Sequence, residues 1–254
     1  KIVADGDCKA AIAEVNSETD FVAKNEKFQN YVEQVAKQAL ASNAADMDAF
    51  MDEKWIADPS ETVKDALVGM IAVISEKLSI RREEKVEEAD GVLANYSHDG
   101  GRISVIVDAS TAVVNDEIRE AIRNIAMQVA ALSAEYVDVA DVSEEKKAHE
   151  KEILMANIIK ENEELPEEKR KPQQILEKQL IGRLNKELKE ICLNDQIYVK
   201  AEDGKQTVAQ YLAEVGKKNG TEIKIRKFVR WEVGEGMEHR QENFAEEVMK
   251  QAQG

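Results

Sequence analysis

The chain has 254 residues, 43% of them hydrophobic, with only 12 glycines and 3 prolines, so it can bury a sizeable core in one or two domains. Its formal net charge of −16 opposes contact with polyphosphate, and we expect no direct nucleic-acid partner. No run approaches the ~20 apolar residues of a membrane span, no apolar signal segment stands at the start, and Cys8 and Cys192 show no metal or disulfide spacing. We therefore expect a soluble protein with no membrane partner, in the cytosol or an organelle matrix.

The first predicted elements surround the polar stretch NSETDFVAKN, residues 16–25. The alternating run KAAIAEVN before it predicts a strand with one covered face, and NEKFQNYVEQVAKQAL after it predicts a helix capped by Asn25. Phe21 lies between them, where an aromatic side chain is normally part of the core. Two alternatives remain for this ring: a place in the core, or a place on the surface facing a partner.

The same design recurs further along the chain. An amphipathic segment beginning at Ser60 is followed by GVLANYSHDGGRISVIVDAS, which predicts a hairpin of two strands, and TEIKIRKFVRWEV predicts a further strand near the end. From Asn115, NDEIREAIRNIAMQVA repeats the apolar pattern of the helix that begins at Asn25. These patterns predict an α+β fold of two similar half-cores, each with antiparallel strands and helices packed on one side. The N-terminal half-core covers residues 1–90, and the C-terminal one covers 91–142 and 193–235.

Residues 143–192 differ from the rest because they are dense in charges of both signs. Their apolar side chains form one narrow seam, made by Leu176, Leu180, Leu184, Leu188 and Ile191. Pro166 and Pro172 bracket a polar apex between the two arms. This pattern predicts an inserted antiparallel helical hairpin, a coiled coil that protrudes roughly 30 Å at ~1.5 Å per residue. The alternative is two helices that lie flat on the globular part.

Conventional active-site motifs are missing from the sequence. It contains no P-loop, no GxGxxG turn, no GxSxG elbow and no HExxH pair, and the three histidines are not clustered. We therefore expect no catalytic residue, no cofactor and no metal site.

Several motifs in this order resemble the elongation factor Ts family of bacteria and organelles. The most specific is EVNSETDFVAKNEKF, and the segments that agree with it are SIRREEKV, YSHDGGRISVIV, IAMQVAAL, KPQQILEKQLIGR, KQTVAQYL and RWEVGEGMEHRQENFAEEV. Family members usually begin with a small helical domain that is lacking here. The resemblance implies a C-terminal helix over 236–254, and it favours the bacterial cytoplasm over an organelle matrix.

The resemblance also implies a function and a set of contact residues. Members of this family are nucleotide-exchange factors for the GTPase elongation factor Tu, and they act without covalent chemistry. The family motif implies that Asp20 and Phe21, flanked by Thr19 and Val22, press on the partner near its Mg²⁺ and phosphate site, which promotes GDP release. Asp20 would either accept backbone hydrogen bonds at the turn or meet the partner directly.

Two further positions carry over from the family. Ile74 corresponds to an apolar contact at a helix end, where this chain has Ser75 in place of the usual glycine. His98 either contacts the partner or hydrogen-bonds within its own turn, and both alternatives stay open. The arms of the hairpin are a candidate surface for a homodimer or heterotetramer.

A second function hypothesis is a coiled-coil interaction scaffold without exchange activity, in which Phe21 is buried and the hairpin is the working surface. The two hypotheses differ in whether Phe21 is exposed in the free protein.

Overall fold

Antiparallel sheets and helices build the fold of the computed structural model, which describes residues 1–237. One sheet has the order β1-β2-β5, and a second has the order β6-β7-β8. The strands are β1 (Ile2–Asp5), β2 (Lys9–Asn16), β5 (Ser79–Glu87), β6 (Val92–His98), β7 (Ile103–Ser110) and β8 (Lys224–Glu232), with β3 (Lys54–Trp55) and β4 (Asp58–Thr62) paired separately. The expected mixture of helices and antiparallel sheets is confirmed. The helix expected over 236–254 lies, from residue 238 on, outside the described residues.

Helices flank these sheets and form the arms of the molecule. They are α1 (Asp20–Ala23), α2 (Glu26–Ala41), α3 (Met47–Asp52), α4 (Val63–Ile74), α5 (Asp116–Leu132), α6 (Glu144–Glu163), α7 (Gln173–Ile191) and α8 (Val208–Lys218). Short 3-10 turns lie at Asp99–Gly101, Val139–Asp141, Glu167–Lys169 and Leu193–Asp195. Within residues 1–237, no helix combines the length and apolarity needed to cross a membrane.

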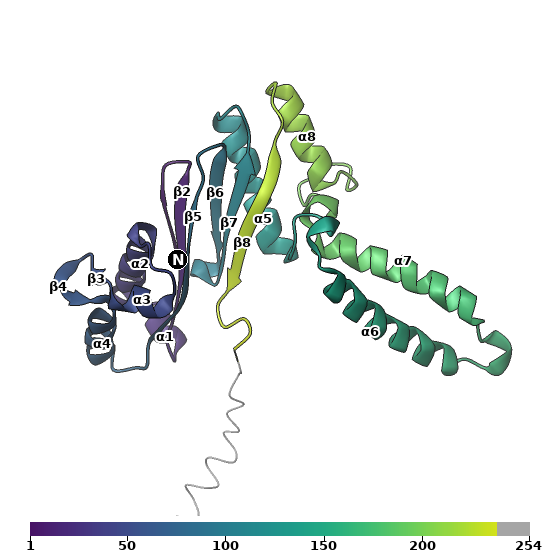
Figure 1. Ribbon diagram of the computed structural model, residues 1–254, viewed down its shortest axis with the longest axis horizontal. Helices are drawn as coiled ribbons and strands as arrows, with labels where there is room; N and C mark the ends of the chain where they lie inside the picture. Colours follow the sequence, from purple (N-terminus) through teal and green to yellow (C-terminus); the bar gives the residue numbers. More distant parts are fainter. Residues whose placement is uncertain (238–254) are drawn as a thin grey trace, which may run out of the picture.

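The central part has four layers: α2, the first sheet, the second sheet and α5 (Figure 1). Alternation along the strands produces them. In β2, Ala11 and Ala13 pack with α2, while Ala10 and Ile12 pack with residues of the second sheet. In β7, the residue Ile106 joins this cluster between the sheets.

The expectation of strands with one covered face is wrong for β2 and β7. Every residue from 10 to 14 and from 104 to 109 is buried, because the face of each sheet that carries no helix packs on the other sheet. The amphipathic segment expected from Ser60 also differs, because its helix begins only at Val63. Thr62 and Asp65 form a capping box there, which leaves Ser60 in strand β4.

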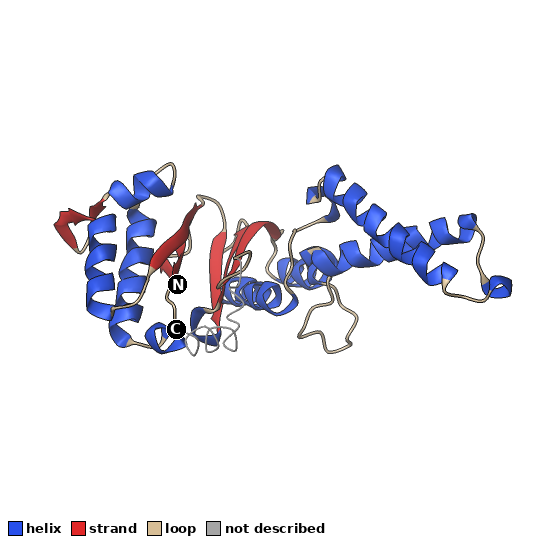
Figure 2. Cartoon of the chain, turned by 90° about the horizontal axis from the view of Figure 1, so that it is seen from below, coloured by secondary structure: helices blue, strands red, loops and turns tan. Residues whose placement is uncertain are grey.

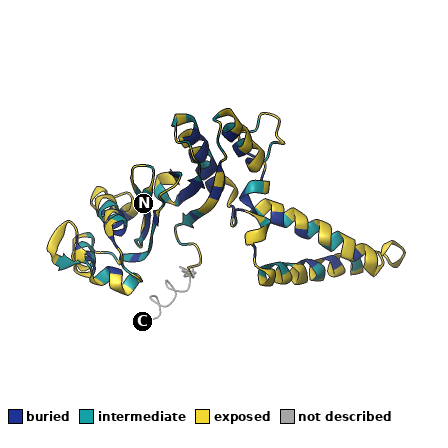
Figure 3. Cartoon of the chain, turned by 45° about the horizontal axis from the view of Figure 1, so that its top comes forward, coloured by how far each residue is buried: buried dark blue, intermediate teal, exposed yellow. Residues whose placement is uncertain are grey.

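Helices α6 and α7 lie against each other and extend away from the two sheets (Figures 1 and 2). Leu154, Leu184 and Leu188 are buried between them and near their base, and outward-facing residues of both arms are exposed (Figure 3). The base is closed by backbone hydrogen bonds, since the amides of Glu135 and Tyr136 both donate to the carbonyl of Ile191. The arms are thus joined to the globular part through one short junction.

Two buried glutamines make matching hydrogen bonds in the two parts of the chain. Gln38 in α2 donates to the carbonyl of Lys54 at 3.3 Å and accepts from the amide of Ile56 at 2.9 Å. Gln128 in α5 donates to the carbonyl of Ile197 at 3.0 Å and accepts from the amide of Val199 at 2.8 Å. Each glutamine therefore fixes an extended segment beside its helix, and each segment leads to a helix with a capping box, α4 or α8.

Candidate protein-binding site

Phe21 lies on the surface of the free protein. Its side chain is 82% exposed, more than that of any other large hydrophobic residue in the described part of the chain. It belongs to the one-turn helix α1, between the end of β2 and the start of α2 (Figure 1). An aromatic ring stabilises a fold mainly by leaving water, so Phe21 contributes little to the stability of the free protein and is available for contact with a partner.

The loop that carries Phe21 is fixed by Thr19. Its hydroxyl oxygen accepts from the amide of Val22 at 3.3 Å, which caps α1. The same hydroxyl donates to Oε1 of Glu76 at 2.8 Å, and the amide of Thr19 donates to Oε2 of Glu76 at 3.2 Å. Glu76 follows the end of α4, so the loop is tied to a second element. Of the two alternatives for Asp20, the first does not match the structure: Thr19 accepts the backbone hydrogen bond at the start of α1, whereas the carboxylate of Asp20 accepts from Nζ of Lys24. The second alternative, direct contact with the partner, stays a prediction.

Val22 points into the protein, next to Phe21 in sequence but on the other side of α1. It is 9% exposed and forms a small cluster with Phe28 and Leu78. Ile74, half-buried at the end of α4, packs against this cluster. Val22 therefore anchors the loop from below, and its side chain is not part of the exposed surface that carries Phe21.

The neighbours of Phe21 in the exposed surface are polar. The carboxylate of Asp20 pairs with Nζ of Lys24 at 3.2 Å, and both side chains are largely exposed.

At the end of α4, Ser75 has φ 63 and ψ 26, the left-handed conformation that normally favours glycine. The serine thus adopts the backbone that ends the helix and brings Glu76 to Thr19.

His98 lies at the same end of the two sheets as Phe21. It ends β6 and pairs with Ile103 at the start of β7, which in turn pairs with Glu232 at the end of β8. Figure 1 shows that β8 ends on the side of the sheets where α1 lies. Nδ1 of His98 is 3.0 Å from the hydroxyl of Tyr96, which supports the hairpin turn, and the side chain stays exposed.

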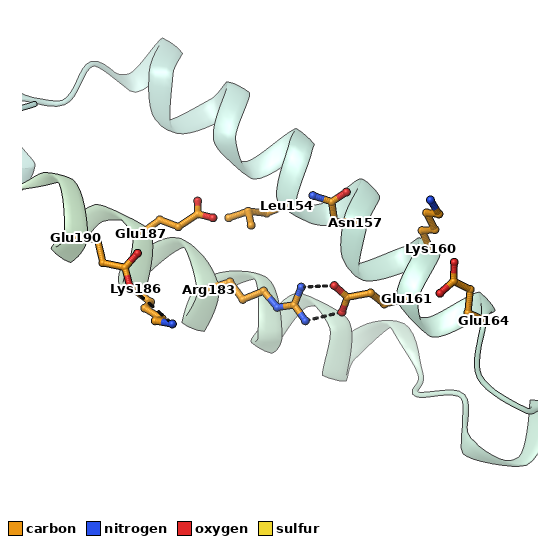
Figure 4. Close-up of a pocket in the computed structure, with 9 residues that line it drawn as sticks. All are labelled: Leu154, Asn157, Lys160, Glu161, Glu164, Arg183, Lys186, Glu187 and Glu190. Carbon is orange, nitrogen blue, oxygen red and sulfur yellow. Dashed lines mark hydrogen bonds and ion pairs between the residues drawn. The ribbon is translucent and has the colours of Figure 1, made fainter. Parts of the chain in front are cut away.

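No sequence pattern pointed to Glu76, although its carboxylate holds the loop through Thr19. A pocket elsewhere, between α6 and α7, is lined mainly by charged side chains, among which Arg183 pairs with Glu161 and Lys186 with Glu190 (Figure 4). There Arg183 donates to both carboxylate oxygens of Glu161, at 2.9 and 2.6 Å. Across residues 1–237, no three histidine, cysteine, aspartate or glutamate side chains gather as a metal ion would require. The most distinctive surface feature is thus an apolar ring on a braced polar loop.

Comparison with known proteins places this loop in a recognised sequence family. The family profile described as Elongation factor TS matches residues 18–235. The protein named elongation factor Ts of Clostridium novyi (strain NT) is 43% identical over 246 residues, which are 96% of this chain and 77% of that protein. That of Clostridioides difficile (strain 630) is 43% identical over 247 residues, 97% and 77% of the two chains. That of Clostridium tetani (strain Massachusetts / E88) is 38% identical over 251 residues, 99% and 79%.

Proposed function

Because this chain belongs to the elongation factor Ts family, we propose that it binds elongation factor Tu and promotes release of GDP from it during translation elongation. The exchange involves no covalent step. The exposed ring of Phe21 is the group that presses on the GTPase near its Mg²⁺ and phosphate contacts. The observation that carries this proposal is the 82% exposure of Phe21 on a loop braced through Thr19 and Glu76.

The mechanism is differential binding. A ligand shifts an equilibrium only by its difference in affinity for the two states, so Phe21 must fit the nucleotide-free GTPase better than the GDP-bound one. A difference of ~2.7 kcal/mol changes the affinity for GDP about a hundredfold. A rigid ring with two side-chain torsions suits this role, because little conformational entropy is lost on binding.

The other contact residues have graded roles in this proposal. Asp20 meets a polar or cationic group of the partner. Its exposed ion pair with Lys24 can be broken for this contact with only a small loss of free energy. Thr19 and Val22 hold the loop and contribute through it. Ile74 and His98 extend the contact surface at the same end of the sheets.

We also infer that the core consists of two related half-cores, residues 1–90 and residues 91–142 with 193–235. The matching bonds of Gln38 and Gln128 support this inference, as do the two capping boxes at α4 and α8. Residues 143–192 are then an inserted coiled-coil hairpin within the second unit.

The decisive experiment is a stopped-flow assay of fluorescent GDP release from elongation factor Tu. We expect the parent chain to accelerate release and Phe21→Ala to lose most of the acceleration, about a hundredfold if the ring supplies the ~2.7 kcal/mol above. Ile181→Ala is the matched control, because it truncates another exposed apolar side chain, on α7. A parent chain without effect on GDP release would overturn the proposal.

A second candidate function, an interaction scaffold, is favoured by the exposed isoleucines of the hairpin, which are Ile153, Ile159, Ile175 and Ile181. In that case Ile181→Ala would weaken association and Phe21→Ala would change nothing. For the assembly we correspondingly propose that these arms form the contact surface of a homodimer, or of a heterotetramer with the GTPase.

A further inference from the structure

A buried carboxylate lies in β2, two residues before the strand ends and the chain enters the Phe21 loop. Glu14 is 5% exposed, in the last part of β2, on the face that meets the second sheet. Nε of Arg82 donates to its Oε2 at 2.6 Å, and Nη1 of Arg81 donates to its Oε1 at 3.1 Å. Both arginines come from the neighbouring strand β5, so the charge of Glu14 is compensated within its own half-core.

The same carboxylate also accepts hydrogen bonds from the end of β2 and from the segment that follows β8. The amide of Gly234, just after β8, donates to Oε1 of Glu14 at 3.2 Å. Nδ2 of Asn16, the last residue of β2, donates to the same oxygen at 3.2 Å and lies 3.5 Å from Sδ of Met237. Nη2 of Arg81 donates to the carbonyl of Glu235 at 2.6 Å. Glu14 thus connects the base of the Phe21 loop to the segment that leaves the C-terminal half-core.

The C-terminal half-core contains a counterpart. Asp108 is 1% exposed on the inner face of β7, and Nε of Arg226 on β8 donates to both its oxygens at 3.0 Å. A register shift follows Asp108 in β7, as one follows Glu14 in β2. Asp108 lies beyond Ile106 along β7, toward the end of the sheets opposite Phe21. The chain therefore has two buried carboxylate–arginine pairs of similar design. Only Glu14 is bonded to Asn16, the residue from which the chain enters the Phe21 loop.

We propose that Glu14 is a positioning residue for nucleotide exchange: it fixes the Phe21 loop relative to the C-terminal half-core, so that both engage the GTPase in one geometry. This inference rests on the proposed function. A loop that can shift against the rest of the binding surface loses conformational entropy when it binds, which reduces the net binding free energy. A displacement of about 1 Å from the productive position can also lower a rate up to a hundredfold. Asp108, with the same burial and partner type, contributes to stability alone.

The test compares four full-length variants in the GDP-release assay: Glu14→Gln, Asp108→Asn, Phe21→Ala and the double variant Glu14→Gln with Phe21→Ala. We expect Glu14→Gln to lower the maximal stimulated rate about tenfold with a much smaller change in the concentration for half-maximal effect. Asp108→Asn keeps the parent rate. In the Phe21→Ala background, Glu14→Gln has little further effect, because it acts through the ring. Additive effects, or equal losses in Glu14→Gln and Asp108→Asn, would overturn the inference.

A second measurement does not depend on exchange activity. Amide hydrogen exchange of residues 17–24 in the free protein should be at least tenfold faster in Glu14→Gln than in the parent, and unchanged in Asp108→Asn. Equal protection in all three proteins would refute the positioning role even if the GDP assay failed for another reason. Should Glu14→Gln not fold, Arg81→Lys replaces it, because a lysine cannot reach Glu14 and the carbonyl of Glu235 at once.

Discussion

Phe21 and Phe28 are two phenylalanines of one short segment with opposite environments, 82% and 5% exposed. Removing a buried ring costs about 3–5 kcal/mol, whereas most surface substitutions cost well under ~1 kcal/mol. We therefore expect Phe21→Ala to melt with the parent protein and Phe28→Ala to melt many degrees lower in thermal denaturation. A large loss of stability in Phe21→Ala would mean that the ring is buried in solution.

Glu14 gives the stability of the protein a pH dependence. Burial alone would raise the pKa of Glu14 from 4.5, but the amide of Gly234 and the guanidinium groups of Arg82 and Arg81 hold this pKa below that value. The unfolded chain then binds more protons than the folded one in the acid range. The contribution of Glu14 is complete above pH 4.5 and is lost as the pH falls through the lower folded pKa.

Urea unfolding of the parent and of Glu14→Gln measures this contribution directly. We expect the parent to be more stable by about 3 kcal/mol near neutral pH, the usual cost of breaking a buried ion pair. The two unfolding free energies should converge as the pH drops below 4.5. A difference that stays constant down to pH 3 would show that the charge of Glu14 is not what matters.

The two cysteines should react very differently. Cys192 is fully buried at the end of α7, and burial, together with the nearby charge of Asp195, raises the pKa of its thiol to about 11. Cys8 is exposed. Because only the thiolate reacts, we expect the folded protein to consume one equivalent of an aromatic disulfide reagent at pH 8, and a second only in denaturant. Fast modification of both thiols in the folded protein would contradict the burial of Cys192.

At the level of single residues, the sequence pattern left two environments open for Phe21, only the family resemblance favoured its exposure, and neither identified the residue that supports its loop. The polar residues around Phe21 raised the question of its exposure, because a loop of polar residues offers few apolar neighbours against which a ring can be buried. Glu76, which holds the loop, is separated from Thr19 by 57 positions, and no local pattern encodes such a contact. Which of two adjacent polar residues caps a short helix depends on backbone angles, so Thr19 rather than Asp20 could not be foreseen.

Among the elements, the helices with strong apolar periodicity and a capping side chain were predictable. Asn25, Asn115 and Ser143 each accept an amide hydrogen bond at the start of a long helix. The short strands β1, β3 and β4 were not anticipated, because two to five residues carry too little alternation to identify a strand.

The junction at the base of α6 and α7 allows a test of their independence. Replacing residues 147–187 by about four glycines bridges the roughly 10 Å between the axes of packed helices and keeps the bonds at Glu135, Tyr136 and Ile191. We expect the shortened protein to unfold in one cooperative transition, because α6 and α7 contact mainly each other and, outside this pair, the 3-10 turn Leu193–Asp195, which the deletion keeps. Loss of cooperativity in calorimetry would mean that the arms belong to the core.

At the scale of the whole molecule, the face-to-face packing of the two sheets could not be derived from the chain. The repeat of strand, loop and helix predicted two units. The sequence of an alanine-rich strand such as β2, however, is compatible with burial of one face or of both faces. Ala10 and Ile12 contribute to the buried cluster between the sheets, and only their neighbours across the interface reveal it.

Nucleotide exchange predicts a reciprocal effect on the complex as a whole. If the factor lowers the affinity of elongation factor Tu for GDP about a hundredfold, GDP must weaken the binding of the factor by the same ratio. Titration calorimetry with GDP-bound and nucleotide-free GTPase measures this ratio. We expect the ratio to shrink toward one in Phe21→Ala, and an unchanged ratio would assign the coupling to another surface.

The two arms α6 and α7 also govern how the molecule moves through water. A compact chain of 254 residues would have a radius of gyration of about 18 Å by the scaling of globular domains. The helices α6 and α7, of 20 and 19 residues, extend from one side of the molecule (Figure 2). They therefore raise the radius of gyration and the frictional drag above those of a compact protein of the same mass. A monomer will consequently leave a gel-filtration column early, at the volume of a larger sphere. Its elution volume reports drag, and light scattering is needed to read its mass.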